Sequence, residues 1–275
     1  AVAMQFLVNS PSPSSAGAAI VAVLLALLVG VLCGAFSGFL VSVVRLQPFI
    51  TTLIMMLAGR GIANMITGGK NAAGNSTSFN WIAQGRVLGF PVGFLLALVV
   101  LAILVLVVRK TALGLSIEAV GINPRAAEMA GIRSGRILFM VYAISGLMAA
   151  IAGVFAVSYI GTVEVSSSGT GSGMEMDAIL AVVIGGTSLA GGKFNLGGTV
   201  LGAFVITALN QVVVYLGVSS AAVPAFKALV IIFICVLQAP MVHGWFSRPG
   251  RGSDGSAQED RTNEAGLNNS KVVSA

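Results

Sequence analysis

The residue types that most often carry chemistry are few in this chain and are not grouped. Its one histidine, His243, rules out a metal site built from several histidines. Cys33 and Cys235 each lie alone in an apolar segment, without the spacing of a metal site or a disulfide. Neither a GxSxG nucleophile elbow nor an HExxH zinc motif occurs. The sequence therefore predicts a protein that is not an enzyme and has no metal or cofactor of its own.

Two glycine-rich stretches resemble nucleotide-binding motifs, but each fails at a required position. For GGK at 191–193 to be a P-loop, Thr187 would have to be glycine and Phe194 serine or threonine. For GTGSGM at 169–174 to be a dinucleotide fingerprint, Met174 would have to be glycine. Any uphill work must therefore draw its energy from an ion gradient or from another chain.

The composition places the chain in a membrane. Hydrophobic residues make up 56% of its 275 residues and charged residues only 9%, which is too little charge to cover a soluble globule of this length. The net charge of +6 comes from basic residues in loops, so it indicates membrane orientation and no nucleic-acid partner. The predicted fold class is an all-α membrane protein, a polytopic transmembrane helix bundle surrounded by lipid.

Several apolar segments are long enough to cross about 30 Å of hydrocarbon as helices. They are 17–44, 49–67, 92–108, 137–160, 196–216 and 224–237. Another stretch, Asp177 to Gly192, has only 16 residues and contains paired glycines, so we expect a broken or re-entrant segment. Irregular backbone at membrane depth suits a translocation path or its gate. The candidate gate residues are Gly185, Gly186, Gly191 and Gly192.

Polar side chains within the apolar segments mark a candidate path. Arg60 lies between two glycines and would cost about 2.5–3.5 kcal/mol at mid-bilayer unless it is paired or hydrated. We expect it to line a polar cavity, and the alternative is that it snorkels to the outer interface. The candidate path residues are Arg60, Asn64, Thr67, Asn210 and Gln211. For the last two, hydrogen bonding between helices is an equal alternative.

Other patterns predict packing and loops. Gly30, Gly34 and Gly38 follow one another at four-residue intervals, which predicts a groove for close packing within the bundle. Residues 68–90 are expected to form a polar outer loop, with Trp81 and Phe90 as interface anchors.

The segment from Arg109 to Arg136 is a long, charge-rich interruption of the apolar chain. Within it, Asn123 is a good helix cap, Pro124 suits the first helical position and Gly131 suits a left-handed stop. These residues predict a helix of about two turns. Because so short a helix is not stable alone in water, we expect its flanks or a docking surface to hold it. The alternative is an ordinary loop with a helical turn.

The basic residues predict the orientation. If the 109–136 loop is cytoplasmic, eleven lysines and arginines fall on that side and only Lys70 and Arg86 fall in outer loops. This count requires the Asp177 to Gly192 stretch to cross the membrane. We expect a membrane domain over 1–244 and a polar, disordered cytoplasmic tail over 245–275.

Three segments together resemble one family. They are RLQPFITTLIMMLAGRGIANMITGG at 45–69, EAVGINPRAAEMAGI at 118–132 and DAILAVVIGGTSLAGGKFNLGGTVLGA at 177–203. They resemble permease subunits of bacterial ABC importers for monosaccharides, in the ribose, galactose and galactofuranose group. The resemblance covers nearly everything from Ala18 to Gln238. The family's early helices and their GGIDLS-like motif have no counterpart here, so we expect an N-terminally truncated form.

The resemblance implies one half of an importer in the bacterial inner membrane. A second permease subunit, identical or not, would pair with it. Two cytoplasmic ABC ATPases would carry ATP and Mg, and a periplasmic sugar-binding protein would deliver the monosaccharide. The 109–136 loop would dock the ATPase through the residues that match the family's loop pattern: Glu118, Gly121, Asn123, Pro124, Ala126, Ala127 and Gly131. The alternatives are a branched-chain amino acid ABC permease, a gradient-driven secondary transporter and a purely structural membrane subunit.

Overall fold

The computed structural model describes residues 1–12, 14–73, 76–87, 89–163, 173–187, 191–192, 194–215, 217 and 228. The chain divides into two compact units, Ala1–Ala208 and Leu209–Ala275. The described residues of the second unit are the end of one helix, Gly217 and Ala228. The segment 224–237, Cys235, His243 and the tail at 245–275 are therefore not part of the described structure, and what the sequence predicts for them stays a prediction.

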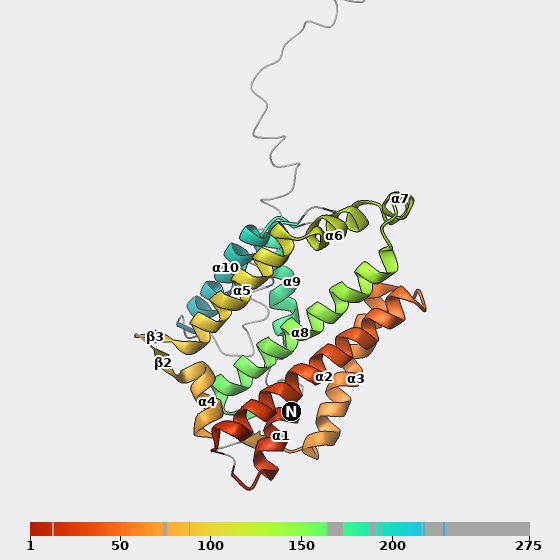
Figure 1. Ribbon diagram of the computed structural model, residues 1–275. Coiled ribbons are helices and arrows are strands. Elements are labelled where there is room, and N and C mark those ends of the chain that lie inside the picture. Colours follow the sequence, from red (N-terminus) through yellow and green to blue (C-terminus); the bar gives the residue numbers. More distant parts are fainter. Residues whose placement is uncertain are drawn as a thin grey trace, which may run out of the picture. The chain divides into compact units, whose positions relative to one another are not determined.

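Five helices of the described residues are long and apolar enough to cross a membrane (Figure 1). They are α2 (Ala16–Ser42), α3 (Pro48–Thr67), α5 (Val92–Lys110), α8 (Ser134–Ile160) and α10 (Leu196–Tyr215). Many of their large apolar side chains are exposed, including Leu57, Leu106 and Phe204, as expected for helices that lipid surrounds. The predicted multi-pass, all-α membrane fold is confirmed, with small differences at the helix ends.

Helices α2 and α8 pack through the predicted glycine groove. A Cβ atom added to Gly34 would lie 2.9 Å from the Cα of Gly146, and one added to Gly30 would lie 2.8 Å from the carbonyl oxygen of Gly146. Since no side chain fits between the two backbones, glycine is what lets the helices approach so closely. The predicted packing within the bundle is therefore confirmed.

At one end of these helices, α1 (Val2–Asn9) and α4 (Thr77–Gln84) complete a small core. Met4, Leu7 and Phe79 are fully buried there, next to Val154 of α8. Two pairs of very short strands also occur among the described residues. In these pairs β1 (Ala72–Ala73) joins β4 (Thr162–Val163), and β2 (Arg86–Val87) joins β3 (Phe90–Pro91).

The prediction of a loop over the polar segment 68–90 is partly wrong, because 77–84 is helical, and its place on the outer side stays a prediction. The Ser76 side chain caps this helix by accepting a hydrogen bond from the Phe79 N–H at 3.3 Å. Ser158 of α8 then holds it, because its Oγ donates to the Phe79 carbonyl at 2.7 Å and accepts from the Ala83 N–H at 3.1 Å. Trp81 and Phe90 are exposed, and their role as membrane-interface anchors stays a prediction.

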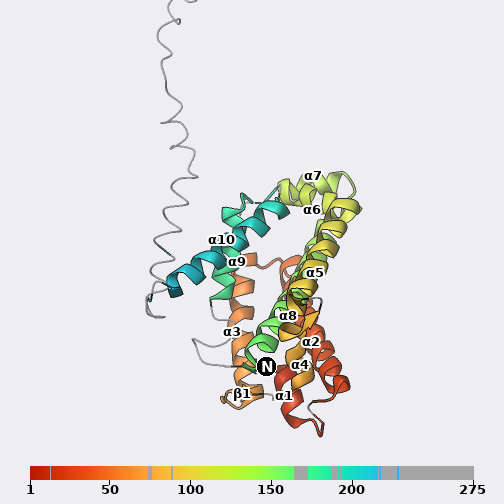
Figure 2. The ribbon, with the colours of Figure 1, turned by 90° about the vertical axis from the view of Figure 1, so that its left-hand side faces the viewer.

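The charge-rich segment between α5 and α8 holds two helices, α6 (Ala112–Ile122) and α7 (Pro124–Met129), both at the same end of α5 and α8 (Figure 2). The sequence predicted only the second. The glycine-rich stretch begins with α9 (Met174–Ile184), whose 11 residues extend about 16 Å, roughly half of the hydrocarbon thickness. Gly186 ends α9 with a left-handed φ of 79°. The broken element is therefore present.

Candidate coupling loop and translocation path

Helix α7 forms as its sequence predicts. The Asn123 Oδ1 accepts hydrogen bonds from the Arg125 N–H at 3.1 Å and the Ala126 N–H at 3.2 Å, and Pro124 takes the first helical position. At the other end Gly131 has a φ of 86°, which allows the Ile132 N–H to donate to the Ala127 carbonyl at 3.0 Å. The cap and the stop together confirm the predicted short helix.

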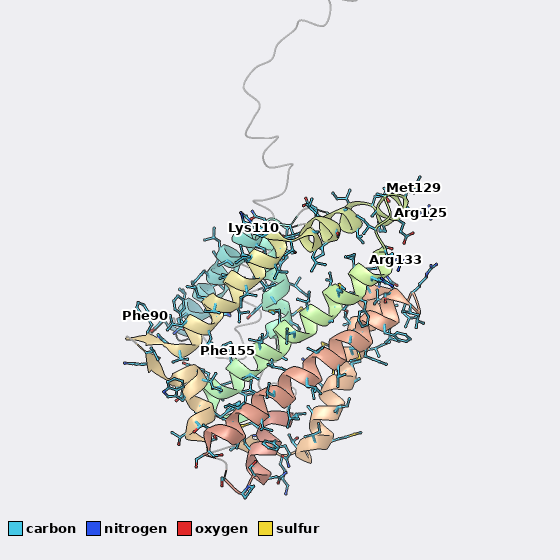
Figure 3. The ribbon with its side chains drawn as sticks, viewed as in Figure 1. Phe90, Lys110, Arg125, Met129, Arg133 and Phe155 are labelled. Atoms are coloured by element: carbon cyan, nitrogen blue, oxygen red, sulfur yellow. The ribbon has the colours of Figure 1, made fainter. Side chains whose placement is uncertain are left out.

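The flanks of α7 hold it against the start of α8. Glu128 accepts a hydrogen bond from the Ser134 hydroxyl, and Ala127 is only 5% exposed. Ala127 therefore faces the chain itself, and its role in docking stays a prediction. Met129 is 91% exposed, and Figure 3 shows it at the tip of the loop together with Arg125, whereas Arg133 lies where the loop joins α8. These exposed side chains were not among the residues that the family pattern singles out.

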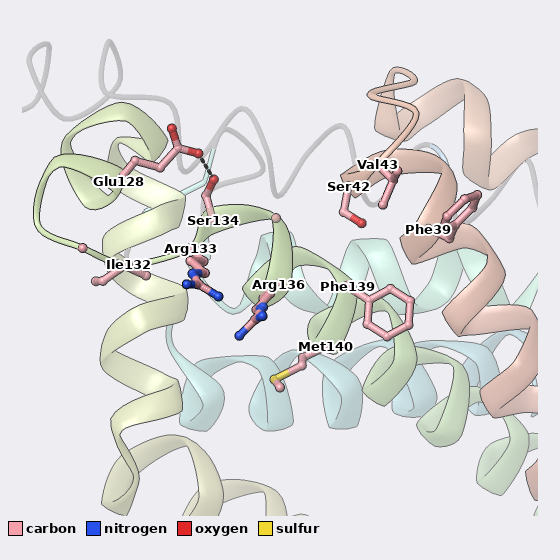
Figure 4. A pocket seen from close by; sticks show the side chains of 12 residues that line it. Phe39, Ser42, Val43, Glu128, Ile132, Arg133, Ser134, Arg136, Phe139 and Met140 are labelled. Atoms are coloured by element: carbon pink, nitrogen blue, oxygen red, sulfur yellow. Dashed lines mark hydrogen bonds between the residues drawn. The ribbon is translucent and has the colours of Figure 1, made fainter.

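A cavity of about 620 Å³ lies beside this loop (Figure 4). Figure 4 shows the Arg133 and Arg136 guanidinium groups on one side of the first turn of α8, away from the Glu128–Ser134 hydrogen bond. Apolar side chains from the ends of α2 and α8, among them Phe39 and Phe139, line the rest. The loop thus offers an apolar cavity with a basic edge next to an exposed short helix.

The end of α6 meets the glycine-rich break directly. A Cβ atom on Gly121 would lie 3.1 Å from the backbone nitrogen of Gly192, and one on Gly191 would lie 2.7 Å from the carbonyl oxygen of Gly121. Gly191 and Gly192 have φ values of 93° and 101°, which side chains rarely allow. The structure therefore brings one residue of the predicted docking pattern against two of the predicted gate glycines. Glu118 lies one turn earlier on α6 and is partly exposed.

Gly185, a third gate glycine, lies beside the start of α10, whereas a Cβ atom on Gly186 would meet nothing within 4 Å. A Cβ atom on Gly185 would lie 2.5 Å from the carbonyl carbon of Gly198, so α9 and α10 approach through bare backbone. Asn195 caps α10, since its Oδ1 accepts from the Gly198 N–H at 3.2 Å. Its own N–H donates to the Thr187 Oγ1 at 3.2 Å, which closes the connection between the two helices.

Arg60 is paired within the membrane segment. Its Nη2 donates to the Glu175 Oε1 at 3.0 Å, and the two side chains are 48% and 38% exposed. Arg60 lies about 18 Å along α3 from Pro48, just past the middle of this helix. Its partner Glu175 lies in the first turn of α9. An acidic residue at the start of a short apolar segment was the signal for this partner.

The remaining path candidates differ in their exposure and in their hydrogen bonds. Asn64 follows Arg60 by one turn on the same face of α3 and is exposed. Thr67 is buried and donates to the Ala63 carbonyl at 3.0 Å, so its hydroxyl is satisfied within its own helix. Asn210 and Gln211 belong to the second unit, where Asn210 is partly buried and Gln211 is exposed. A path that contains all five residues stays a prediction.

No group of three or more metal-ligating side chains occurs in the part of the chain that the structure describes. The titratable residues that do meet in this region, Arg60 and Glu175, form an ion pair of opposite charge. This arrangement can bind polar groups and hold two helices together. It does not resemble a nucleophile with its base.

Comparison with known proteins indicates a transport permease. The family model for the permease component of a branched-chain amino acid transport system matches residues 1–237. A fructose import permease of Bifidobacterium longum is 52% identical over 225 residues, which cover 80% of this chain and 63% of the relative. A galactofuranose transporter permease of Escherichia coli is 42% identical, with coverage of 80% and 64%.

A ribose import permease of Escherichia coli is 39% identical over 218 residues, which cover 78% of this chain and 67% of that protein. This chain thus spans about two thirds, or slightly less, of the length of these three relatives. No solved structure matches the chain significantly. The predicted resemblance to sugar-import permeases is confirmed, and the chain belongs to this family of membrane transport permeases.

Proposed function

We propose that the chain is a permease subunit of an ABC importer and forms part of the membrane path of a monosaccharide. The observation that carries the proposal is its 52%, 42% and 39% identity to permeases named for fructose, galactofuranose and ribose. The family model is named for branched-chain amino acids. Identity to three permeases that are all named for sugars favours a sugar over that alternative.

The structure supports α7 as the place where a cytoplasmic ATPase docks. A helix of six residues is too short to be stable by itself, so its cap, its stop and its contact with α8 must hold it in place. The exposed Met129 is an adaptable apolar side chain, suited to a pocket on a partner. ATP and Mg would be bound by that partner, and the 109–136 loop and the C-terminus would face the cytoplasm of a bacterial cell.

Docking would drive alternating access. ATP binding would close the ATPases and move α7 of this chain and of a second permease subunit. Each of the two states must be favoured by a few kcal/mol through its partner contacts. Asn64 and the Arg60–Glu175 pair would offer hydrogen-bonding groups to sugar hydroxyls at mid-depth. The sugar can be held weakly there if a periplasmic binding protein supplies the specificity.

One observation favours a second candidate function. Glu175 is an acidic residue that meets Arg60 at membrane depth, and ionisable groups in such places often serve ion-coupled transport. A secondary transporter would need no ATPase and would not need the exposed α7. The two candidates therefore differ in their source of energy.

Uptake measurements separate the two. Radiolabelled fructose, galactofuranose and ribose would be offered to cells that carry the chain together with the genes of its transport system. We expect uptake of one of these sugars to stop when ATP is depleted and to continue when an uncoupler collapses the proton gradient while ATP is maintained. Uptake that stops with the gradient alone would contradict the ABC assignment and support the secondary transporter.

A further inference from the structure

The contact between the end of α6 and the glycine-rich break joins two segments that are far apart in the sequence. Gly121 lies against Gly191 and Gly192 through backbone atoms alone, and a Cβ atom on Gly191 would clash with the Gly121 carbonyl oxygen at 2.7 Å. Both views place α6 beside the start of α10 (Figures 1 and 2). Contact between bare backbones leaves little slack, because no flexible side chain lies between the two segments.

On one side of this contact the chain leads directly to α7. Helix α6 ends at Ile122, and Asn123 is at once the residue after α6 and the cap of α7. The Asn123 side chain holds the first turn of α7 by two hydrogen bonds, at 3.1 and 3.2 Å. A displacement of α7 therefore reaches Gly121 through only two residues, Asn123 and Ile122.

On the other side the contact leads to both halves of the broken element. Gly192 lies three residues before Asn195, which caps α10 and donates to the Thr187 Oγ1 beyond the end of α9. Gly185 and Gly198 then hold α9 and α10 together backbone to backbone. At its far end α9 carries Glu175, the partner of Arg60.

We infer that the contact of Gly121 with Gly191 and Gly192 is the mechanical link between the docking helix α7 and the α9–α10 element of the path. Gly121 is then a positioning residue: it touches neither sugar nor nucleotide, and it makes the glycine break follow the docked helix. This inference rests on the proposed function and specifies how its two parts communicate. The competing explanation is that the contact only packs the two segments together. In that case a substitution at Gly121 would lower the thermal stability but not the sugar transported per ATP.

The test compares three variants in the complete transporter, purified with its ATPase and reconstituted in proteoliposomes. Gly121→Ala places a methyl group 3.1 Å from the Gly192 nitrogen, which displaces the contact by a few tenths of an ångström, and Gly121→Val displaces it further. Gly153→Ala in α8 is the matched control, because a Cβ atom there would meet nothing within 4 Å. Sugar transported per ATP hydrolysed, ATPase retention and thermal stability would be measured together.

We expect Gly121→Ala to retain the ATPase and wild-type stability but to transport at least about fivefold less sugar per ATP, the lower end of typical coupling effects. Gly121→Val should lower the sugar transported per ATP further, and Gly153→Ala should leave it at the wild-type value. Unchanged transport per ATP in Gly121→Ala would overturn the inference, as would a loss of uptake that only follows a loss of stable protein. Failure of the wild-type chain to retain any ATPase would instead overturn the proposed function.

Discussion

The Arg60 guanidinium donates a hydrogen bond to the Glu175 carboxylate across 115 positions of the sequence, and it does so about halfway along a membrane helix. This pair ties α3 to the first turn of the short helix α9. Neither charge has to be left alone in the hydrocarbon region, which reduces the cost of placing both residues there. The first turn of α9 is therefore held beside the middle of α3.

Removal of one member of the Arg60–Glu175 pair should destabilise the protein more than removal of both. Glu175→Gln leaves the Arg60 charge without its partner, and the cost should approach about 2.5–3.5 kcal/mol, the value for a charge at the bilayer centre. We expect a lowered Tm of the purified protein in detergent or lipid nanodiscs for Glu175→Gln and for Arg60→Met.

The double variant Arg60→Met with Glu175→Gln serves as the control for this prediction. Because no charge is left unpaired, its Tm should lie closer to that of the wild type than the Tm of Glu175→Gln alone. Additive losses in the double variant would show that the two residues do not stabilise each other.

The α2–α8 groove should tolerate no side chain. A Cβ atom on Gly146 would lie 2.7 Å from the Cα of Gly34, so Gly146→Ala should destabilise the protein by about 1–3 kcal/mol through overpacking, and Gly146→Leu by more. Membrane protein level and Tm are the measurements. Gly153→Ala on the same helix is the control, and a wild-type Tm for Gly146→Leu would show that the two helices do not pack this closely.

The cap of α7 can be tested separately from its exposed surface. Asn123→Ala removes the acceptor of two backbone hydrogen bonds and should cost about 0.5–2 kcal/mol of local stability. Faster hydrogen exchange at 124–129 and weaker ATPase retention should follow. Asn123→Asp keeps an acceptor and should restore both, whereas equal exchange in Asn123→Ala and the wild type would contradict the capping role.

Ser158 should hold α4 in place. Ser158→Ala removes one donor and one acceptor, and it leaves the buried Phe79 carbonyl and the Ala83 N–H without this partner. A cost of about 1–3 kcal/mol is expected for unsatisfied buried groups. Limited proteolysis should then cut near 77–84 faster than in the wild type. Thr77→Ala, at an exposed position of the same helix, is the control, and equal cleavage of Ser158→Ala and this control would contradict the prediction.

The sequence was sufficient where structure depends on local rules. Long apolar stretches predicted the five described membrane helices because length and hydropathy alone decide whether a helix can span a bilayer. Asn123 and Gly131 predicted α7 because a cap and a left-handed stop act within a few residues.

It was insufficient where structure depends on partners distant in the chain. Helix α4 forms in a polar segment because Phe79 is buried against α8 and Ser158 bonds its backbone, and neither contact is visible in 68–90 alone. The sequence alone does not show that α9 begins beside α3, which makes Glu175 the partner of Arg60. The contact of Gly121 with Gly192 likewise joins two motifs that the sequence presents separately.

The most direct test of the account is whether an ABC ATPase binds through α7. The transport system would be purified by a tag on the ATPase from cells that carry the wild-type chain, Arg125→Glu with Met129→Glu, or Arg86→Glu at the opposite end. We expect the α7 double variant to reach the membrane normally but to lose at least about tenfold in copurification and in sugar uptake. The Arg86→Glu control should match the wild type. Undiminished copurification and uptake in the α7 variant would contradict the proposed docking role.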